Sequence, residues 1–248
     1  MGEVMGAAKK IIRKFRKVFS PPNANDNKHY VLRSYLKPDG SFDYERYRAI
    51  QNAGNNKKID KNWVLPENIA FLSQFLKSEL PNIKFGLCHG TRRGLEQQWF
   101  REHLQCEVIG TEIADTALQF PNTIQWDFHE VKPEWIGNVD FIYSNALDHS
   151  YNPELCLARW MSCLRPGGIC ILEHATASEP QYTSDLDPFG ASLLIMPYLI
   201  LKWGKGTFHV QQILDAPALQ RKMGYTSFLI IRHHGMAAMK RSPVEHRV

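Results

Sequence analysis

The alternation of helix-like and strand-like segments from residue 66 onward constrains the fold of this chain more than any other feature of its sequence. The segment PENIAFLSQFLKSEL carries apolar residues at helical spacing, and short apolar runs separated by helix-like segments follow it. Strands separated by helices of this length form β-α-β units with parallel strands. The sequence therefore predicts an α/β fold with a doubly wound, mostly parallel sheet.

Seven strands and several helices are expected in this part of the chain. The strands are predicted at residues 83–88, 107–113, 123–126, 139–145, 169–174, 207–213 and 226–233. The helices are predicted to begin at Pro66, to span 93–104 and 153–164, and to lie near 115–119 and 216–222. The stretch 175–206 is too long for an ordinary connection, so we expect an insertion that covers a substrate. Its residues 193–203 either pack into the core or form an apolar wall toward an acceptor or a membrane.

Two segments precede this domain, which is expected to span residues 66–248. Residues 1–22 are predicted to form a basic amphipathic helix, because six Lys and Arg residues alternate with apolar residues there. That helix could be solvated or docked on the core, contact a membrane through residues 3–19, contact nucleic acid, or be a removed presequence. Residues 23–65 are expected to be a linker and N-terminal cap, with a helix that fails near Gly54 and a turn in its Gln and Asn cluster.

Composition narrows the class of protein. Of the 248 residues, 44% are hydrophobic and 22% are charged, which is typical of a soluble globular domain with one packed core. The five cysteines are odd in number and form no CxxC pair, which argues against a disulfide framework and a structural zinc site and favours a reducing cytosol. No apolar run approaches the roughly 18 residues that span a bilayer. We therefore expect a cytoplasmic protein, with peripheral membrane contact as an open alternative.

The turn in KFGLCHGTRRGLEQQWF, between a predicted strand and a predicted helix, is the first indication of a ligand site. Glycine lets the backbone approach a ligand closely, and in doubly wound sheets ligands bind beyond the carboxyl ends of the strands. Glu112 ends the next strand 22 residues beyond Gly90, where a carboxylate can accept both hydroxyl hydrogens of a ribose. Asp127 follows the third strand, where it could accept a hydrogen bond from the exocyclic amine of adenine while Ile113 or a flanking aromatic residue covers the ring.

In these features the chain resembles the class I S-adenosylmethionine-dependent methyltransferases over about residues 66–175. The glycine turn, the two acids, the segment DFIYSNALDH and the unit LRPGGICILEH occur in the order of that family. The chain departs from the family within the turn, where members usually have an acid followed by Gly-x-Gly-x-Gly. When the motif is aligned on Gly90, Gly86 stands at the acid, and Cys88 and Arg92 stand at the outer glycines.

The resemblance implies that S-adenosylmethionine is the cofactor. Arg92 or Arg93 could take its carboxylate, because a guanidinium binds a carboxylate bidentately. The residues that the resemblance places around the cofactor are Gly86, Cys88, Gly90, Arg92, Glu112, Ile113, Asp127, Phe128 and Asn145.

Methyl transfer requires an aligned acceptor and, for an alcohol, a group that removes its proton. Asp148 and His149 follow the fourth strand, and His174 follows the fifth. We expect His149 to be the base because imidazole titrates near neutral pH, with Asp148 orienting it or holding the substrate and His174 as a second candidate. Each of these residues could instead be a turn or capping residue. The lack of a Pro-Pro-aromatic pattern after Asn145 favours an oxygen acceptor.

No metal site is predicted. Assistance by a metal would require clustered ligands, and the acidic and histidine residues after these strands show no ligand-pair spacing. The residues considered for such a cluster are Asp148, His149, Glu173, His174, Asp185 and Asp187.

The function expected from these features is O-methylation of a small molecule, or of a glycan or lipid-linked intermediate presented at a membrane. Three alternatives remain at this stage. A non-catalytic adaptor with the same fold is compatible with the substituted glycines. An RNA methyltransferase is compatible with the basic N-terminal segment but lacks an aromatic-interleaved basic surface elsewhere. A nicotinamide-dependent oxidoreductase should have a Gly-x-Gly-x-x-Gly turn for the pyrophosphate, and the spacing in GLCHGTRRG differs.

Overall fold

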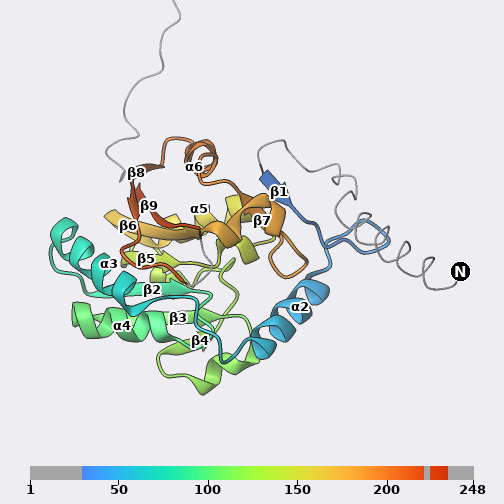
Figure 1. The fold of residues 1–248 in the computed structure, drawn as a ribbon, viewed down its shortest axis with the longest axis horizontal. Helices are drawn as coiled ribbons and strands as arrows, with labels where there is room; N and C mark the ends of the chain where they lie inside the picture. Colours follow the sequence, from blue (N-terminus) through green and yellow to red (C-terminus); the bar gives the residue numbers. More distant parts are fainter. Residues whose placement is uncertain (1–29, 221–223, 234–248) are drawn as a thin grey trace, which may run out of the picture.

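The computed structural model describes residues 30–220 and 224–233, so the predicted basic helix at 1–22 lies outside the described residues. The described chain is built on a seven-stranded sheet with the strand order β4-β3-β2-β5-β6-β9-β8 (Figure 1). The strands are β2 (Phe85–His89), β3 (Glu107–Glu112), β4 (Thr123–Gln125), β5 (Val139–Ser144), β6 (Leu164–Ala175), β8 (Phe208–Asp215) and β9 (Thr226–His233). The predicted doubly wound, mostly parallel sheet is confirmed.

Strand direction places the ligand-binding edge of this sheet. Strands β2 to β6 run parallel to one another, whereas β9 lies antiparallel between β6 and β8. The chain winds outward in one direction from β2 to β4 and in the other direction from β5 onward. The carboxyl ends of β2 and β5 therefore border the crevice at the switch point, where doubly wound sheets bind ligands.

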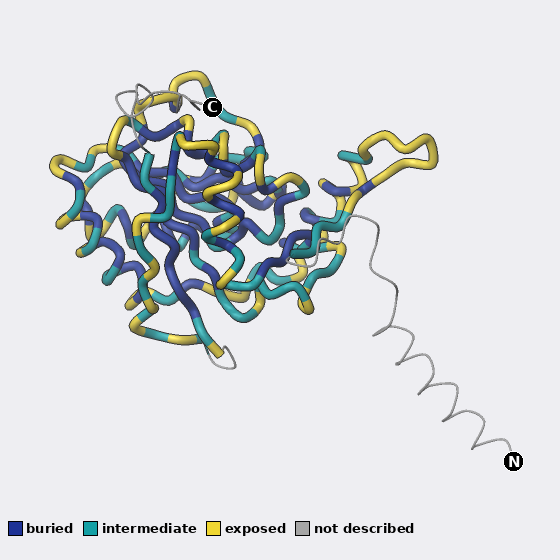
Figure 2. Tube along the Cα trace, turned by 90° about the horizontal axis from the view of Figure 1, so that it is seen from above, coloured by how far each residue is buried: buried dark blue, intermediate teal, exposed yellow. Residues whose placement is uncertain are grey.

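Helices cover both faces of the sheet (Figure 1). One apolar cluster packs α3 (Pro66–Glu79) and α4 (Leu95–Leu104) against the sheet, and the other packs α5 (Pro153–Cys163) and α6 (Met196–Gly204) against the opposite face. Alternate residues of one strand point to opposite clusters, as Leu87 and Cys88 of β2 do. Buried residues consequently concentrate along the strands, and exposed residues lie at the periphery (Figure 2).

Local sequence signals explain where the helices begin. Pro66 and Pro153 occupy first-turn positions of α3 and α5, where their missing N–H groups cost nothing. The Asn152 side chain caps α5 by accepting a hydrogen bond from the backbone N–H of Leu155. None of the helices in the described part of the chain is long and apolar enough to cross a membrane.

The segment before residue 65 packs against the insertion that follows β6. Strand β1 (Tyr30–Leu32) pairs antiparallel with β7 (Phe189–Ala191) in a separate two-stranded sheet. Helix α2 (Tyr44–Lys57) is tied to the same region, because the Gln51 side chain donates a hydrogen bond to the carbonyl of Leu186 at 2.8 Å. The segment before residue 65 and the insertion after β6 therefore meet beside the crevice.

The expectation that the helix after residue 43 fails near Gly54 is wrong. Helix α2 continues through Gly54 to Lys57, and a Cβ at Gly54 would lie 2.3 Å from Cδ1 of Leu186. The glycine therefore permits a close helix–loop contact and does not end the helix. Its neighbours Gln51 and Asn55 are buried on one helix face and do not form the predicted turn.

Two other local predictions also need correction. Residues 216–220 are not helical, since the Asn68 side chain makes two hydrogen bonds to the backbone of Ala218 and holds it in a loop. Strand β6 begins at Leu164, so the RPGG segment lies inside an irregular strand and does not simply separate a helix from a strand. The short segment Asp115–Gln119 is a 3-10 helix.

The insertion at 175–206 contains two 3-10 turns, β7 and α6. Met196, Leu199, Ile200 and Trp203 of α6 are buried, which confirms that this part packs into the core. Leu194 and Tyr198 remain exposed on its outer side.

Candidate active site

A cavity of about 360 Å³ opens at the carboxyl ends of β2, β5 and β6. Its wall includes the glycine turn, the residues after β5 and part of the insertion. A smaller cavity adjoins it and is lined by Glu112, Ile113 and Phe128 together with residues of α2. The two cavities share Lys58, Gly90, Arg92, Ala146 and His149. The residues at the sheet's switch point are therefore gathered in one place.

The turn after β2 has no room for a side chain at its centre. Gly90 has φ +75°, and a Cβ there would lie 2.4 Å from Cβ of Ala146. Arg92 adopts φ +44°, a left-handed conformation that glycine tolerates and that costs other residues about 1–2 kcal/mol. That conformation explains why a glycine is usual at this position in proteins with the motif. In this chain the same backbone shape is kept with an arginine.

Glu112 connects this turn to the end of β3 through hydrogen bonds. Its carboxylate accepts hydrogen bonds from the backbone N–H of Arg92 and of Ala114, each at 3.0 Å. The residue is buried at the wall of the smaller cavity. Because an ionised carboxylate has about four lone-pair sites, two remain for other donors such as ribose hydroxyls. The geometry fits the predicted role of Glu112.

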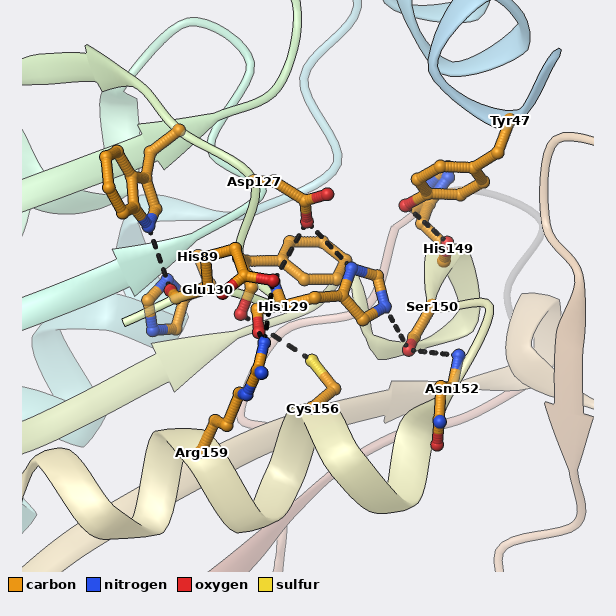
Figure 3. A network of polar contacts seen from close by, with 12 residues as sticks. Tyr47, His89, Asp127, His129, Glu130, His149, Ser150, Asn152, Cys156 and Arg159 are labelled. Atoms are coloured by element: carbon orange, nitrogen blue, oxygen red, sulfur yellow. Dashed lines mark hydrogen bonds and ion pairs between the residues drawn. The ribbon is translucent and has the colours of Figure 1, made fainter. Parts of the chain in front are cut away.

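Asp127 is engaged within the protein (Figure 3). Its Oδ1 accepts hydrogen bonds from the backbone N–H and Nδ1 of His129 at 2.9 and 2.7 Å, and its Oδ2 accepts one from the Tyr44 hydroxyl at 2.9 Å. Burial alone would raise the pKa of Asp127, but the hydrogen bonds and charge of His129 outweigh it and lower the pKa. Asp127 does not line either cavity, whereas its neighbour Phe128 does. Contact between Asp127 and adenine stays a prediction.

The same network contains a Ser–His–Asp arrangement (Figure 3). His129 Nε2 lies 2.7 Å from Oγ of Ser150, and its Nδ1 lies 2.7 Å from Asp127. Both Ser150 and His129 are fully buried, and Ser150 Oγ also accepts a hydrogen bond from the N–H of Asn152. A hydrolytic nucleophile must reach its substrate, so this network has a structural role.

His149 lies at the wall of both cavities in a short 3-10 turn, Leu147–His149, after β5. Its Nδ1 lies 3.0 Å from Oε1 of Gln51 and 2.9 Å from the carbonyl oxygen of Leu186. Both neighbours are acceptors, so the proton is on Nδ1. Its Nε2 lies 3.5 Å from Oδ1 of Asp187.

Asp148, which precedes it, also lines the larger cavity. Its Oδ1 is buried and has no hydrogen-bond partner among the described residues. Burial raises the pKa of this carboxyl to about 6. The corner after β5 therefore presents the unpartnered Oδ1 of Asp148 beside the imidazole of His149.

The comparison with known proteins agrees with this arrangement. Residues 87–172 match the family model described as a methyltransferase domain. The matched segment runs from β2 to β6 and spans the switch point of the sheet, so this part of the chain resembles a methyltransferase domain. No curated protein sequence matches this chain.

Solved structures share the fold of this chain at low sequence identity. A 1,6-didemethyltoxoflavin N1-methyltransferase from Burkholderia thailandensis is 14% identical, with a TM-score of 0.59, over 87% of this chain and 100% of its own. A methyltransferase from Haloferax volcanii, solved with its Trm112 activator, is 14% identical, with a TM-score of 0.53, over 79% of this chain and 100% of its own. The [4+2]-cyclase SpnF is 9% identical, with a TM-score of 0.57, over 83% of this chain and 99% of its own. Since a cyclase shares the fold, activity must be argued from the site.

Besides Asp127, three residues predicted for the site lie outside the two cavities. Gly86 and Cys88 are inside β2, where a Cβ at Gly86 would meet the Phe141 ring and burial raises the pKa of the Cys88 thiol. Neither residue is in the turn, which begins only after β2 ends at His89. His174 does not line the larger cavity, because its Nε2 is held by the carbonyl of Ala191 at 2.9 Å. Burial also lowers the pKa of His174.

Asn145, in contrast, lines the larger cavity, as predicted from its place after β5. Glu173 also lines it and accepts a hydrogen bond from the Tyr143 hydroxyl at 2.7 Å. Burial raises the pKa of Glu173 to about 7. Arg92 and Arg93 both lie at the cavity wall, and the Nε of Arg92 is buried with no partner among the described residues.

Several lining residues escaped the sequence analysis. Lys58, Lys61 and Trp63 come from the segment expected to be a linker, and Tyr182 comes from the insertion. Glu96, in the first turn of α4, is buried at the cavity wall, and burial raises its pKa to about 8. These side chains join the site through tertiary packing. A local signal exists only for Gln51 and Asn55, whose i, i+4 spacing defines one helix face.

Proposed function

We propose that this chain transfers a methyl group from S-adenosylmethionine to a hydroxyl oxygen of an acceptor bound in the larger cavity. The acceptor class is a small molecule, or a glycan or lipid-linked intermediate. The observation that carries the proposal is the meeting of two cavities at the glycine turn, with Glu112 at the wall of one, Asp148 at the wall of the other and His149 at both. The residues around the smaller cavity suit a nucleoside, and those around the larger cavity suit an acceptor that must lose a proton.

The residues of the smaller cavity fit the adenosine end of the cofactor. Glu112 has free lone pairs for the ribose hydroxyls, and Ile113 and Phe128 give the same cavity apolar walls for a base. The side-chain-free backbone at Gly90 allows close approach to the sugar. When bound, S-adenosylmethionine supplies a methyl group on a sulfonium, which is electrophilic at carbon.

Arg92 fits the carboxylate at the other end of the cofactor. Its side chain is anchored by a hydrogen bond from Nη1 to the carbonyl of Lys61 at 3.2 Å, whereas its buried Nε has no partner. A buried unsatisfied donor costs about 1–3 kcal/mol, and a carboxylate in the cavity would satisfy it. We therefore assign carboxylate binding to Arg92 in preference to Arg93.

The hydroxyl proton of the acceptor is removed at the corner after β5. Asp148 Oδ1 and His149 Nε2 are the atoms there without a hydrogen-bond donor, and both residues line the larger cavity. An acceptor hydroxyl near them is oriented before it attacks, which is the main requirement of an in-line displacement.

Transfer of labelled methyl tests this function. The full chain is incubated with methyl-labelled S-adenosylmethionine and fractions of hydroxylated metabolites, glycans and lipid extracts, and products are identified by mass spectrometry. We expect a product whose methyl group is bound to oxygen, formed by the wild type and not by the Asp148→Asn variant. Products methylated only on nitrogen would contradict the acceptor class, and no product from any fraction would favour a non-catalytic adaptor.

Peripheral membrane contact through residues 3–19 belongs to the same proposal. Its support is the sequence alone, in which basic and apolar residues alternate. Co-sedimentation of the full chain with anionic vesicles tests it, with neutral vesicles and a chain lacking residues 1–22 as controls. Equal sedimentation of both chains would refute the contact.

A further inference from the structure

Three side chains at one corner of the larger cavity form a set of possible metal ligands. One nitrogen of His149 and one carboxylate oxygen each of Asp148 and Asp187 lie within 4.8 Å of one another. Nitrogen and oxygen ligands about 2.1 Å from a cation are separated by about 3.0–3.4 Å when they are neighbours in its coordination shell. The 3.5 Å between His149 Nε2 and Asp187 Oδ1 is already close to that separation.

The hydrogen bonds of His149 orient its ring toward Asp187. Gln51 and Leu186 both present oxygen atoms to Nδ1, so Nδ1 carries a proton and donates to them. Nε2 then points to the Asp187 carboxylate and lies 3.5 Å from its Oδ1, so that a cation between these two atoms would be bound by both. Metal-bound histidines typically donate their other N–H to an oxygen in this way.

The two carboxylates are arranged consistently with this interpretation. The Ser184 hydroxyl donates a hydrogen bond to Asp187 Oδ2 at 2.9 Å, which holds the carboxylate while Oδ1 points to His149. Asp148 Oδ1 is buried without a partner, and no ion pair joins Asp148 to a cation in the part of the chain that the structure describes. A buried carboxylate oxygen with no donor is costly unless a ligand satisfies it.

We propose that Asp148, His149 and Asp187 bind one divalent transition-metal cation such as Mn²⁺ at the wall of the larger cavity. Carboxylates suit Mg²⁺, Ca²⁺ and Mn²⁺, whereas an imidazole ligand favours a transition metal, and Mn²⁺ accommodates both. Three protein ligands leave further coordination positions open. The inference deepens the proposed function and rests on it, because those positions are available to oxygen atoms of a hydroxylated acceptor. In this account Asp148 and His149 hold the cation in place of acting as the base, and the cation would orient the acceptor hydroxyl for attack.

This site revises the expectation that no metal is bound. Asp148 and His149 lie in the turn after β5, and Asp187 comes from the insertion, so the ligands are distant in sequence. Glu173, His174 and Asp185, which the sequence also offered, are not part of the set.

Direct titration with Mn²⁺ tests the proposal. The full chain, freed of metals with a chelator and dialysed, is titrated with MnCl₂ while free Mn²⁺ is followed by electron paramagnetic resonance and heat by calorimetry. We expect one Mn²⁺ per chain in the wild type. Asp148→Asn should weaken binding at least tenfold and leave the melting temperature unchanged or higher, since Oδ1 has no hydrogen bond to lose.

Asp185→Asn is the matched control, because Asp185 lies on the same loop and pairs with Arg33 and Arg46. It should bind Mn²⁺ like the wild type. Gln51→Leu tests positioning, and it should weaken Mn²⁺ binding about 10- to 100-fold by freeing the imidazole. Its fold is checked by circular dichroism, and the Asp148→Asn result stands even if Gln51→Leu does not fold.

Failure of the wild type to bind Mn²⁺, or equal binding by Asp148→Asn and Asp185→Asn, would overturn the metal site. Titration of the metal-free protein with S-adenosylhomocysteine in parallel separates this outcome from the proposed function. Binding of S-adenosylhomocysteine without Mn²⁺ binding would refute the metal site only. Loss of both would refute the methyl-transfer proposal as well.

Discussion

Replacing Glu112 by glutamine should reveal its double role in the turn and in the ligand site. The carboxylate accepts one hydrogen bond from the N–H of Arg92 and one from the N–H of Ala114, through different oxygens. In Glu112→Gln one of those oxygens becomes an NH₂ group. Whichever way the amide is oriented, one backbone N–H then faces a donor in a buried position.

The expected magnitudes follow from these contacts. A buried donor left unsatisfied costs about 1–3 kcal/mol. Since each kcal/mol shifts the melting temperature of a domain of this size by about 2–4 °C, we expect a fall of about 2–12 °C. Loss of a charge-assisted hydrogen bond to a ribose hydroxyl adds about 1.5–3 kcal/mol to the binding free energy, which weakens S-adenosylhomocysteine binding about ten- to hundredfold.

Differential scanning calorimetry and isothermal titration of the same samples measure the two effects separately. Glu107→Gln is the control, because Glu107 begins the same strand and is exposed. A lower melting temperature with unchanged ligand affinity would show that Glu112 only supports the turn, and it would refute its assignment to the ribose.

Three further perturbations test the account. Gly90→Ala should lower the melting temperature and abolish S-adenosylhomocysteine binding, because the new Cβ would overlap Cβ of Ala146. Gly137→Ala is the control, because Gly137 also has a positive φ but has open space around it. Calorimetry of both variants isolates the effect of the clash. Glu96→Gln should stabilise the protein above about pH 5. In the native state Glu96 keeps its proton up to a pKa of about 8, whereas in the unfolded chain it loses the proton near pH 4.5. The stability of the wild type should therefore fall as the pH rises between these two values. Urea unfolding at pH 5 and pH 8 should show a smaller fall in the variant. Ser150→Ala should reduce stability by about 1 kcal/mol through lost hydrogen bonds and leave S-adenosylhomocysteine affinity unchanged, and loss of that affinity would contradict a purely structural network.

Local sequence patterns were sufficient where the structure depends on neighbouring residues. The central strands could be predicted because they are short apolar runs buried on both faces, as the fully buried β5 shows. Glu112 and His149 could be predicted as site residues because the carboxyl ends of parallel strands meet at one edge of the sheet. These predictions required only the strand order and the fold class.

Contacts between distant segments account for what the sequence could not predict. The sequence around Gly54 predicts a helix end. The structure shows instead that a glycine is required there because Leu186, which is distant in the chain, packs against it. Asp187 joins Asp148 and His149 only because the insertion folds back over the carboxyl ends of the strands. Side chains that meet through such packing have no local spacing that identifies them.

Calorimetric titration of the purified full chain with S-adenosylhomocysteine, with NADH titrated in parallel, tests the central claim most directly. The account predicts one S-adenosylhomocysteine per chain with micromolar affinity and no heat from NADH. Folded protein that binds no S-adenosylhomocysteine, or that binds NADH in its place, would contradict it.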